Sequence, residues 1–276
     1  MLMRGDPAMS GPIFRISVAF LVGVLALLAL ALCASDYYRA EQQRLLAAGD
    51  ARGASNASKM ALRLDPFDTD ALEAQALTLQ QQEKYEEAAA VLRGAIERDP
   101  NNYFPYLLLG NAQLAMDDPE AAVGSYRDVL ELNPKATTAS VYMAQTMISQ
   151  GRLQDAKEEY LRLEREGRLP DDALYNLGRI ELRTGDAEEG LRDIKAARRQ
   201  TRSDLEDLEG PAKRQLQETL RGMDLAVADA MVVAGREARA REILANSPSE
   251  QAPSLLRLLN SDPDAYREQV VNSDIY

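Results

Sequence analysis

The sequence predicts an all-α fold, in which an N-terminal transmembrane helix is followed by a solenoid of repeated helix pairs. Three observations lead to this prediction. A long run without a charge extends from Ile16 to Ala34. Further along, Pro66, Pro100 and Pro134 recur at a constant interval of about 34 residues, within the range of periods typical of helical repeat arrays. Finally, only 5% of the residues are aromatic and Trp is absent, which suits helices packed closely through small side chains.

The apolar segment, residues 16–34, follows a short N-terminal arm, residues 1–15. A helix of that length is about 28 Å long, close to the ~30 Å hydrocarbon core of a bilayer. Tyr37 and Tyr38 follow it, at the place where aromatic rings favour the headgroup layer. The segment could instead be a cleaved signal peptide or, through Cys33, a lipoprotein signal, but it is longer than the usual signal core. We therefore predict a transmembrane helix or uncleaved signal anchor.

The flanking charges do not fix the orientation of this helix. Arg4 and Arg15 precede it, and Arg39, Arg44 and Arg52 follow it, which leaves little bias between the two sides. A short arm followed by one span and a large domain usually leaves the arm in the cytoplasm. We therefore expect a single-pass protein of the bacterial cytoplasmic membrane, with the repeat domain on the extracytoplasmic side.

Three further sets of residues recur at the interval of the prolines. One set is small through five copies, a second is Ala or Gly, and a third is bulky. In that order they are Ala54, Ala88, Ala122, Ala156 and Gly190; Ala76, Gly110, Ala144 and Gly178; and Leu92, Tyr126, Tyr160 and Ile194. Small residues on the first helix of a pair let the second approach closely, and the bulky residue fills the space beside them. Prolines then end each second helix.

This pattern resembles the tetratricopeptide repeat family, in a membrane-anchored bacterial form. The matching residues are Leu109 and Gly110 with Ala122, Tyr126 and Pro134, and Tyr85 to Ala88 leading to Ala95, Asp99 and Pro100. The resemblance implies a right-handed α-solenoid and covers residues 35–204 in five repeats: 35–68, 69–102, 103–136, 137–170 and 171–204. No repeat has the family's Trp, and the first has Gln42 where a small residue is expected.

After the fifth repeat the phase of the repeats breaks. We therefore predict an insertion over residues 205–220, with a long helix from Pro211 to Ala234 that ends at Gly235. Residues 221–276 are predicted to form a degenerate repeat and C-terminal capping helices. The last repeat of an array must cover an apolar face from water, which fits a divergent, polar end.

The composition argues against several function classes. A net charge of −12 repels phosphate backbones, so no nucleic acid is expected as a partner. The absence of His removes the usual general base and the commonest metal ligand, and a single Cys cannot form a zinc site alone. We predict that the chain is not an enzyme, and that it has no catalytic residues, cofactor, metal site or small-molecule substrate.

In the related family, the first helices of the repeats line a concave surface that binds partners. The matching positions here are mainly apolar or amide residues, which suits an extended peptide or a helix of a partner protein. They are Phe104, Leu107, Leu108, Asn111, Leu114, Val141, Tyr142, Gln145, Ile148, Tyr175, Asn176, Arg179 and Leu182. In the competing interpretation, several of these residues pack between neighbouring first helices, and the C-terminal segment could fill part of the groove.

The predicted function is therefore that of a membrane-anchored scaffold, which binds protein partners and assembles or stabilises a membrane or cell-envelope complex. Two alternatives remain open. The chain could be a constitutive structural subunit of a large membrane complex, or a secreted or lipid-anchored periplasmic repeat protein.

Overall fold

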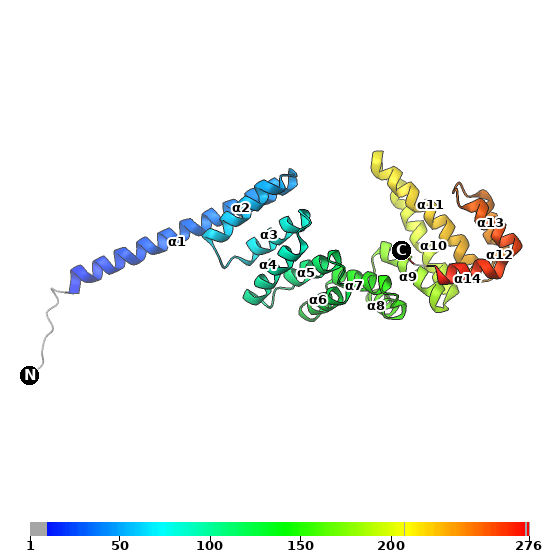
Figure 1. Ribbon diagram of the computed structural model, residues 1–276, viewed down its shortest axis with the longest axis horizontal. Coiled ribbons are helices and arrows are strands. Elements are labelled where there is room, and N and C mark those ends of the chain that lie inside the picture. The colour runs from blue at the N-terminus through cyan, green and yellow to red at the C-terminus, as the bar shows by residue number, and fades with distance from the viewer. Residues whose placement is uncertain (1–9, 207, 274, 276) are drawn as a thin grey trace, which may run out of the picture. The chain divides into compact units, whose positions relative to one another are not determined.

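A computed structural model describes residues 10–206, 208–273 and 275 of the chain, and every regular element in this part is an α-helix (Figure 1). The predicted all-α class, with helix pairs following an apolar N-terminal helix, is thereby confirmed. The chain divides into two compact units, Met1–Leu132 and Asn133–Tyr276.

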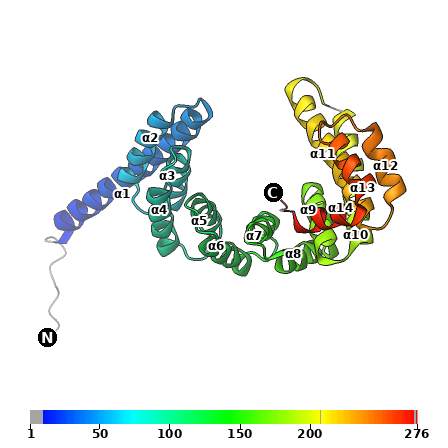
Figure 2. The ribbon, with the colours of Figure 1, turned by 45° about the vertical axis from the view of Figure 1, so that its right-hand side comes forward.

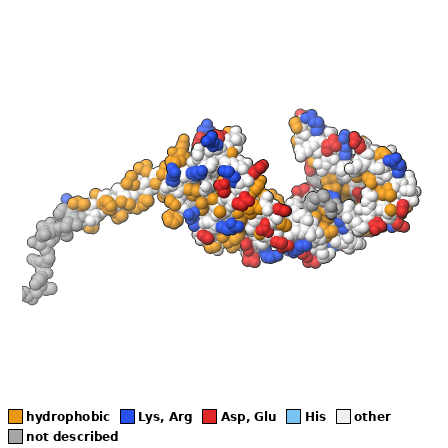
Figure 3. Space-filling view, in the orientation of Figure 1, with side chains coloured by type: hydrophobic (Ala, Val, Ile, Leu, Met, Phe, Trp, Pro, Cys, Tyr) orange, Lys and Arg blue, Asp and Glu red, His pale blue; other side chains and the backbone are white. Residues whose placement is uncertain are grey.

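The first unit consists of antiparallel helix pairs joined by short turns. Its helices are α1 (Ser10–Ala47), α2 (Ala51–Leu64), α3 (Thr69–Gln81), α4 (Tyr85–Arg98), α5 (Phe104–Ala115) and α6 (Pro119–Leu132). Helix α1 is one continuous element of 38 residues. It contains both the predicted membrane segment and the helix that packs against α2. Figure 3 shows apolar side chains over the N-terminal part of this helix.

The second unit continues with further pairs and then a group of C-terminal helices. They are α7 (Thr137–Ser149), α8 (Leu153–Arg165), α9 (Asp171–Thr184), α10 (Ala187–Glu206), α11 (Gly210–Val233), α12 (Glu237–Asn246), α13 (Ala252–Ser261) and α14 (Pro263–Asn272). The expected helix from Pro211 to Ala234 is present as α11. It runs without a break through position 220, where the sequence suggested the end of an insertion.

The turns within the five pairs share one backbone conformation, which recurs at the interval of the repeats. A residue with positive φ ends each first helix: Gly49, Glu83, Asp117, Gly151 and Gly185, with φ between 59° and 97°. The following residue donates its N–H to a carbonyl five positions back, for example Lys84 to Leu79 at 2.9 Å. These bonds satisfy carbonyl groups that a helix end otherwise leaves unpaired. These turns are therefore helix C-caps.

Close helix approach within the pairs depends on the small residues identified in the sequence. A Cβ atom added at Gly110 would lie 2.5 Å from Cε1 of Tyr126, and one at Gly178 would lie 2.8 Å from Cγ1 of Ile194. Both bulky partners are completely buried. The small and bulky residues therefore fit each other within a pair, as their common spacing predicted.

The first pair departs from this pattern and compensates for it. Gln42 occupies the small position on α1 and is buried, with its amide Nε2 donating to Thr78 Oγ1 at 3.0 Å. The bulky position on α2 holds Ser58, which is also completely buried. The large and the small side chain have thus exchanged helices, and the pair still packs closely.

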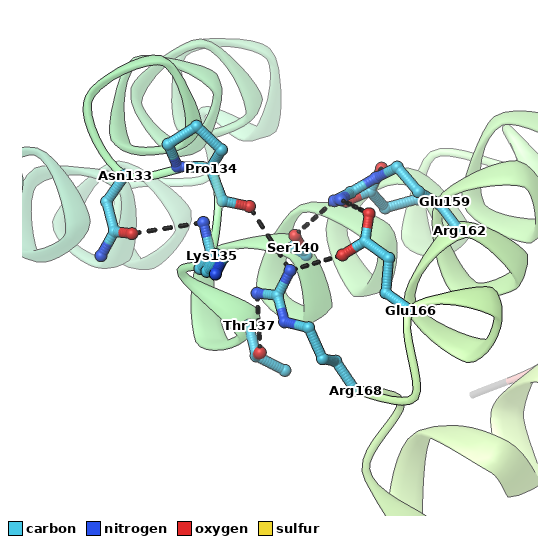
Figure 4. A network of polar contacts seen from close by, with 9 residues as sticks. All are labelled: Asn133, Pro134, Lys135, Thr137, Ser140, Glu159, Arg162, Glu166 and Arg168. Carbon is cyan, nitrogen blue, oxygen red and sulfur yellow. Dashed lines mark hydrogen bonds and ion pairs between the residues drawn. The ribbon is translucent and has the colours of Figure 1, made fainter.

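A polar network at the start of the second unit ties α8 to α7 (Figure 4). Arg162 donates to Ser140 Oγ at 2.9 Å and Arg168 donates to Thr137 Oγ1 at 3.0 Å. Both guanidinium groups also pair with Glu166. This network fixes the segment after α8, where Pro170 comes later than the prolines that follow α2, α4 and α6.

The C-terminal helices close the second unit around their own apolar core. Leu259 of α13 and Tyr266 of α14 are buried with Val227, Met231 and other residues of α11. Helix α14 contacts both α9 and α11 and lies beside them in both ribbon views (Figure 2).

Candidate functional site

In the first unit, a hollow is formed by the first helix of each pair. Its walls come from α1, α3 and the beginning of α5. The lining residues are Asp36, Arg39, Ala40, Gln43, Asp70, Glu73, Ala74, Leu77 and Phe104. We call this surface the α1–α3–α5 hollow. It combines an apolar part, contributed by Leu77 and Phe104, with a charged rim.

The charges of this rim are mostly acidic. Arg39 pairs with Asp70 at 2.7 Å and with Asp36 at 2.6 Å, so its charge is more than balanced. Burial and the neighbouring Asp70 carboxylate raise the pKa of Glu73 to about 7. Asn102 donates to Glu73 Oε1 at 2.7 Å. The hollow therefore suits a ligand that carries a cation beside an apolar group.

Of the predicted groove residues on α5, only Phe104 lines this hollow. Leu108 is buried with Ala76, Leu79 and Leu92 in the core between the pairs. Asn111 accepts a hydrogen bond from the Tyr126 hydroxyl at 2.8 Å. Leu108 and Asn111 thus have packing roles. Phe104 and Leu107 are half-buried, and Leu114 is 37% exposed.

On α7, in the second unit, the predicted groove residues divide in the same way. Val141 and Ile148 are buried. Gln145 is half-buried, whereas Tyr142 is 36% exposed. Tyr142 is therefore the groove residue of α7 that a partner reaches most easily.

Three of the four predicted residues of α9, namely Tyr175, Arg179 and Leu182, lie against the C-terminal helices. Leu182 is buried in the core that α11, α13 and α14 build. Tyr175 packs on that core, Asn176 is half-buried, and the Arg179 guanidinium lies 5.5 Å from the Tyr175 ring centre. A pocket of about 290 Å³ remains between α9, α11 and α14.

Helix α14 is tied to α9 by hydrogen bonds across this pocket. Arg183 donates from Nε to the Ser273 carbonyl at 2.8 Å and from Nη2 to Ser273 Oγ at 2.7 Å. The suggestion that the C-terminal segment fills part of the groove fits this contact. In the second unit, the accessible part of the predicted surface is therefore concentrated on α7.

Two residues at this contact were not singled out in the sequence. The Tyr266 hydroxyl donates to Asp229 Oδ1 at 2.7 Å. Burial raises the pKa of Asp229, although this hydrogen bond and Arg183 oppose the shift. The pair joins α14 to α11 across 37 positions of the chain. No periodicity signals such a pair, because it depends on where α14 docks.

The described residues contain no group of three or more His, Cys, Asp or Glu side chains placed to hold a metal ion. Among the same residues, one helix is long and apolar enough to cross a membrane, at Phe14–Ala47 with a mean hydropathy of 2.8 over its most apolar window. A signal sequence would pass the same test of length and composition.

Sequence comparison decides the family. Models of the tetratricopeptide repeat match residues 79–124, 114–171 and 143–204. The chain belongs to the tetratricopeptide repeat family. No curated protein matches its sequence.

Solved structures share the fold of this repeat protein. A tetratricopeptide repeat protein from Parabacteroides merdae is 16% identical with a TM-score of 0.59, covering 88% of this chain and 94% of that chain. MamA from Desulfovibrio magneticus is 19% identical with a TM-score of 0.53, over 62% and 96%. A further structure of MamA is 22% identical with a TM-score of 0.53, over 59% and 90%. At these identities the likeness concerns the fold alone.

Proposed function

We propose that this chain is a membrane-anchored scaffold of bacterial type, whose tetratricopeptide repeats bind segments of partner proteins. Through this binding it assembles or stabilises a membrane or cell-envelope complex. One observation carries the proposal: the apolar residues 16–34 and the first helix of the repeats are parts of the same helix, α1.

Retention of the apolar segment is favoured by the environment of the next residue. Ser35 is buried and donates its hydroxyl to the Ala61 carbonyl at 3.1 Å. Cleavage after Ala34 would place a new charged terminus on this buried residue, which costs free energy unless the charge finds a partner. An uncleaved anchor avoids that cost and covers the exposed apolar surface of α1 with lipid.

The partner surface is best supported where apolar groove residues remain accessible. These are Leu114 in the first unit and Tyr142 in the second, together with the α1–α3–α5 hollow. Because the hollow is acidic with an apolar part, it suits a partner segment in which Lys or Arg lies next to an apolar side chain.

A constitutive membrane subunit is the second candidate, and one observation favours it. A Cβ atom added at Gly23, within the apolar segment, would meet no neighbouring atom of the described residues within 4 Å. A small residue with open space around it permits close approach of a partner helix in a membrane. In that case α1 would bind other membrane helices at fixed stoichiometry.

The proposal is tested by site-specific photo-cross-linking of the full-length protein in its native membrane. A photoreactive amino acid is placed at Leu114 or Tyr142, with Leu132 as the matched control. Leu132 is also an exposed apolar residue, but it lies at the end of a second helix, α6. Defined protein adducts from Leu114 or Tyr142, absent from Leu132, support the scaffold.

The same samples separate the candidate functions. Before irradiation, partners that stay at a constant ratio through purification in mild detergent favour the constitutive subunit, and substoichiometric partners favour the assembly factor. Equal labelling at all three positions would contradict binding at the predicted surface. Recovery of the parent protein in the soluble fraction would contradict the anchor. Protease treatment of spheroplasts reports the side, since an outward repeat domain is digested.

A further inference from the structure

We propose that the loop between α2 and α3, residues 65–68, is a second membrane contact, in which Phe67 enters the headgroup layer of the bilayer beside α1. This inference rests on the proposed anchoring of the chain by residues 16–34. It assigns to the first repeat a lipid-binding surface, separate from the surfaces that would bind partner proteins.

The position of the loop along α1 follows from the pairing of α1 with α2. The Ser35 hydroxyl reaches the Ala61 carbonyl at 3.1 Å, so these two residues lie at the same level. Helix α2 runs back toward the apolar segment and ends at Leu64, about 4.5 Å further along its axis. The loop therefore lies level with the last turn of the apolar segment.

The burial pattern of α1 agrees with this position of the loop along the helix. Side chains from Phe14 to Leu30 are exposed, whereas Ala31 and Ala34 are partly covered. These two alanines share a helix face, because they are separated by nearly one helical turn. Since α2 is the element that packs beside this part of α1, we attribute the cover to its C-terminal end and the following loop.

Phe67 is the most exposed large apolar side chain among the described residues, at 81%. Tyr37 of α1, two residues after Ser35, is 65% exposed. Aromatic side chains concentrate at the level where a membrane meets water, and both residues lie at that level if residues 16–34 span the bilayer. Arg63, exposed in the last turn of α2, is suitably placed for lipid phosphates.

The loop is held firmly to α1 from its other side. Arg39 pairs with Asp70 at 2.7 Å and with Asp68 at 3.5 Å. Asp68 also caps α3 by accepting from the Ala71 N–H at 3.0 Å, and Asp65 accepts from the Phe67 N–H at 3.0 Å. The acidic groups that flank Phe67 are thus engaged by local donors. This reduces their repulsion from lipid phosphates and fixes the place of the loop.

The absence of Trp from the chain allows a direct test. The full-length protein is prepared with a single Trp as F67W, Y37W or A48W and reconstituted into phosphatidylcholine vesicles, with and without brominated acyl chains. Ala48 is exposed in the turn after α1, about 21 Å along the helix from Ala34. Bromine quenches only a Trp within or next to the acyl region.

We expect bromine to reduce the emission of Trp in F67W and Y37W by a similar factor, and to leave A48W unchanged. Quenching of Y37W without quenching of F67W would overturn the lipid contact while leaving the anchor in place. Failure of all three proteins to float with the vesicles would overturn the anchor. Shielding of F67W from iodide in native membranes, but not in vesicles, would assign the loop to a protein partner and so overturn the inference.

Discussion

At the N-terminal end of the chain, Phe20 on α1 exposes 74% of its surface, whereas at the C-terminal end Leu259 and Tyr266 expose at most 1%. Each end adjoins a stack of helix pairs that needs its apolar face covered. Helices α13 and α14 supply that cover within the second unit. In the first unit, the described part of α1 before Ser35 is left mostly without protein cover.

This difference indicates two ways of covering the apolar surface at the end of a repeat array. Protein covers the C-terminal end, so substitutions there should change the free energy of unfolding. Under the proposed anchoring, lipid covers the apolar part of α1 at the N-terminal end, so substitutions there should change the partition of the protein into the membrane. Substitutions at the two ends should therefore change different measured quantities.

The largest effect is expected from charges within the apolar segment. Leu25 and Leu28 are exposed side chains near its middle. Two arginines there cost about 5–7 kcal/mol for insertion, at ~2.5–3.5 kcal/mol each. We expect the L25R/L28R protein to move from the membrane to the soluble fraction or to aggregate, as measured by flotation. The melting of its repeats, followed by circular dichroism, should stay as in the parent. A lower melting temperature would show that the segment also stabilises the fold.

At the other end, removal of the Tyr266 ring should destabilise the C-terminal cap formed by α13 and α14. Truncation of a fully buried aromatic residue costs about 3–5 kcal/mol, and Asp229 loses the hydroxyl that binds it. We expect Tyr266→Ala to lower the free energy of unfolding of the second unit by that amount in chemical denaturation, without a change in flotation.

Tyr266→Phe is the matched control, because it keeps the ring and removes only the hydroxyl. Its cost should be about 1–3 kcal/mol, the penalty of a buried group left without its donor. Equal effects of the two substitutions would mean that ring packing contributes little, and that α14 is held mainly by Asp229.

Interior pairs should respond differently from both ends. At Gly110 an added Cβ atom meets the Tyr126 ring at 2.5 Å, whereas at Gly124 it meets no neighbouring atom of the described residues within 4 Å. Gly110→Ala should lower the free energy of unfolding by about 1–3 kcal/mol through overpacking. Gly124→Ala should raise it by up to about 1 kcal/mol, because alanine favours the helix. Chemical denaturation measures both, and effects of the same sign would refute the close approach.

The sequence predicted those features that depend on local spacing. The repeat registers predicted that the small residue Gly110 and the bulky Tyr126 pack together within one pair. The exchange of sizes between Gln42 and Ser58 was only partly predicted. The sequence marked Gln42 as a departure from the small residue expected there, but did not draw attention to Ser58. The compensation appears only when both positions of the pair are compared.

The parts of the candidate site that could not be predicted depend on packing between distant segments. A groove position found by register, such as Leu108 or Leu182, does not reveal whether a neighbouring helix covers it. Leu182 is buried in a core to which the C-terminal helices contribute, and α14 returns to α9 through Arg183 and Ser273, 90 positions apart. Helical periodicity carries no information about where such a segment docks.

The smallest expected effect concerns a buried carboxyl group in the last interior pair, next to the cap. Glu181 of α9 and Asp193 of α10 are both buried. Burial, and then the Asp193 carboxylate, raise the pKa of Glu181 well above its usual range, while Lys157 and Arg192 oppose the shift. Below this raised pKa, Glu181 therefore keeps its proton in the folded state.

In the unfolded chain this carboxyl ionises near pH ~4.3, so above that pH the folded state binds more protons. The free energy of unfolding should then fall as the pH rises from about 4.3 toward the raised pKa of the folded state. Glu181→Gln keeps a donor toward Asp193 without a titrating proton, so it should remove this slope and raise the melting temperature at about pH 8. Glu189→Gln, the same substitution at an exposed position of α10, is the control. If both variants keep the slope of the parent, Glu181 is ionised in the folded state and its charge is balanced by Lys157.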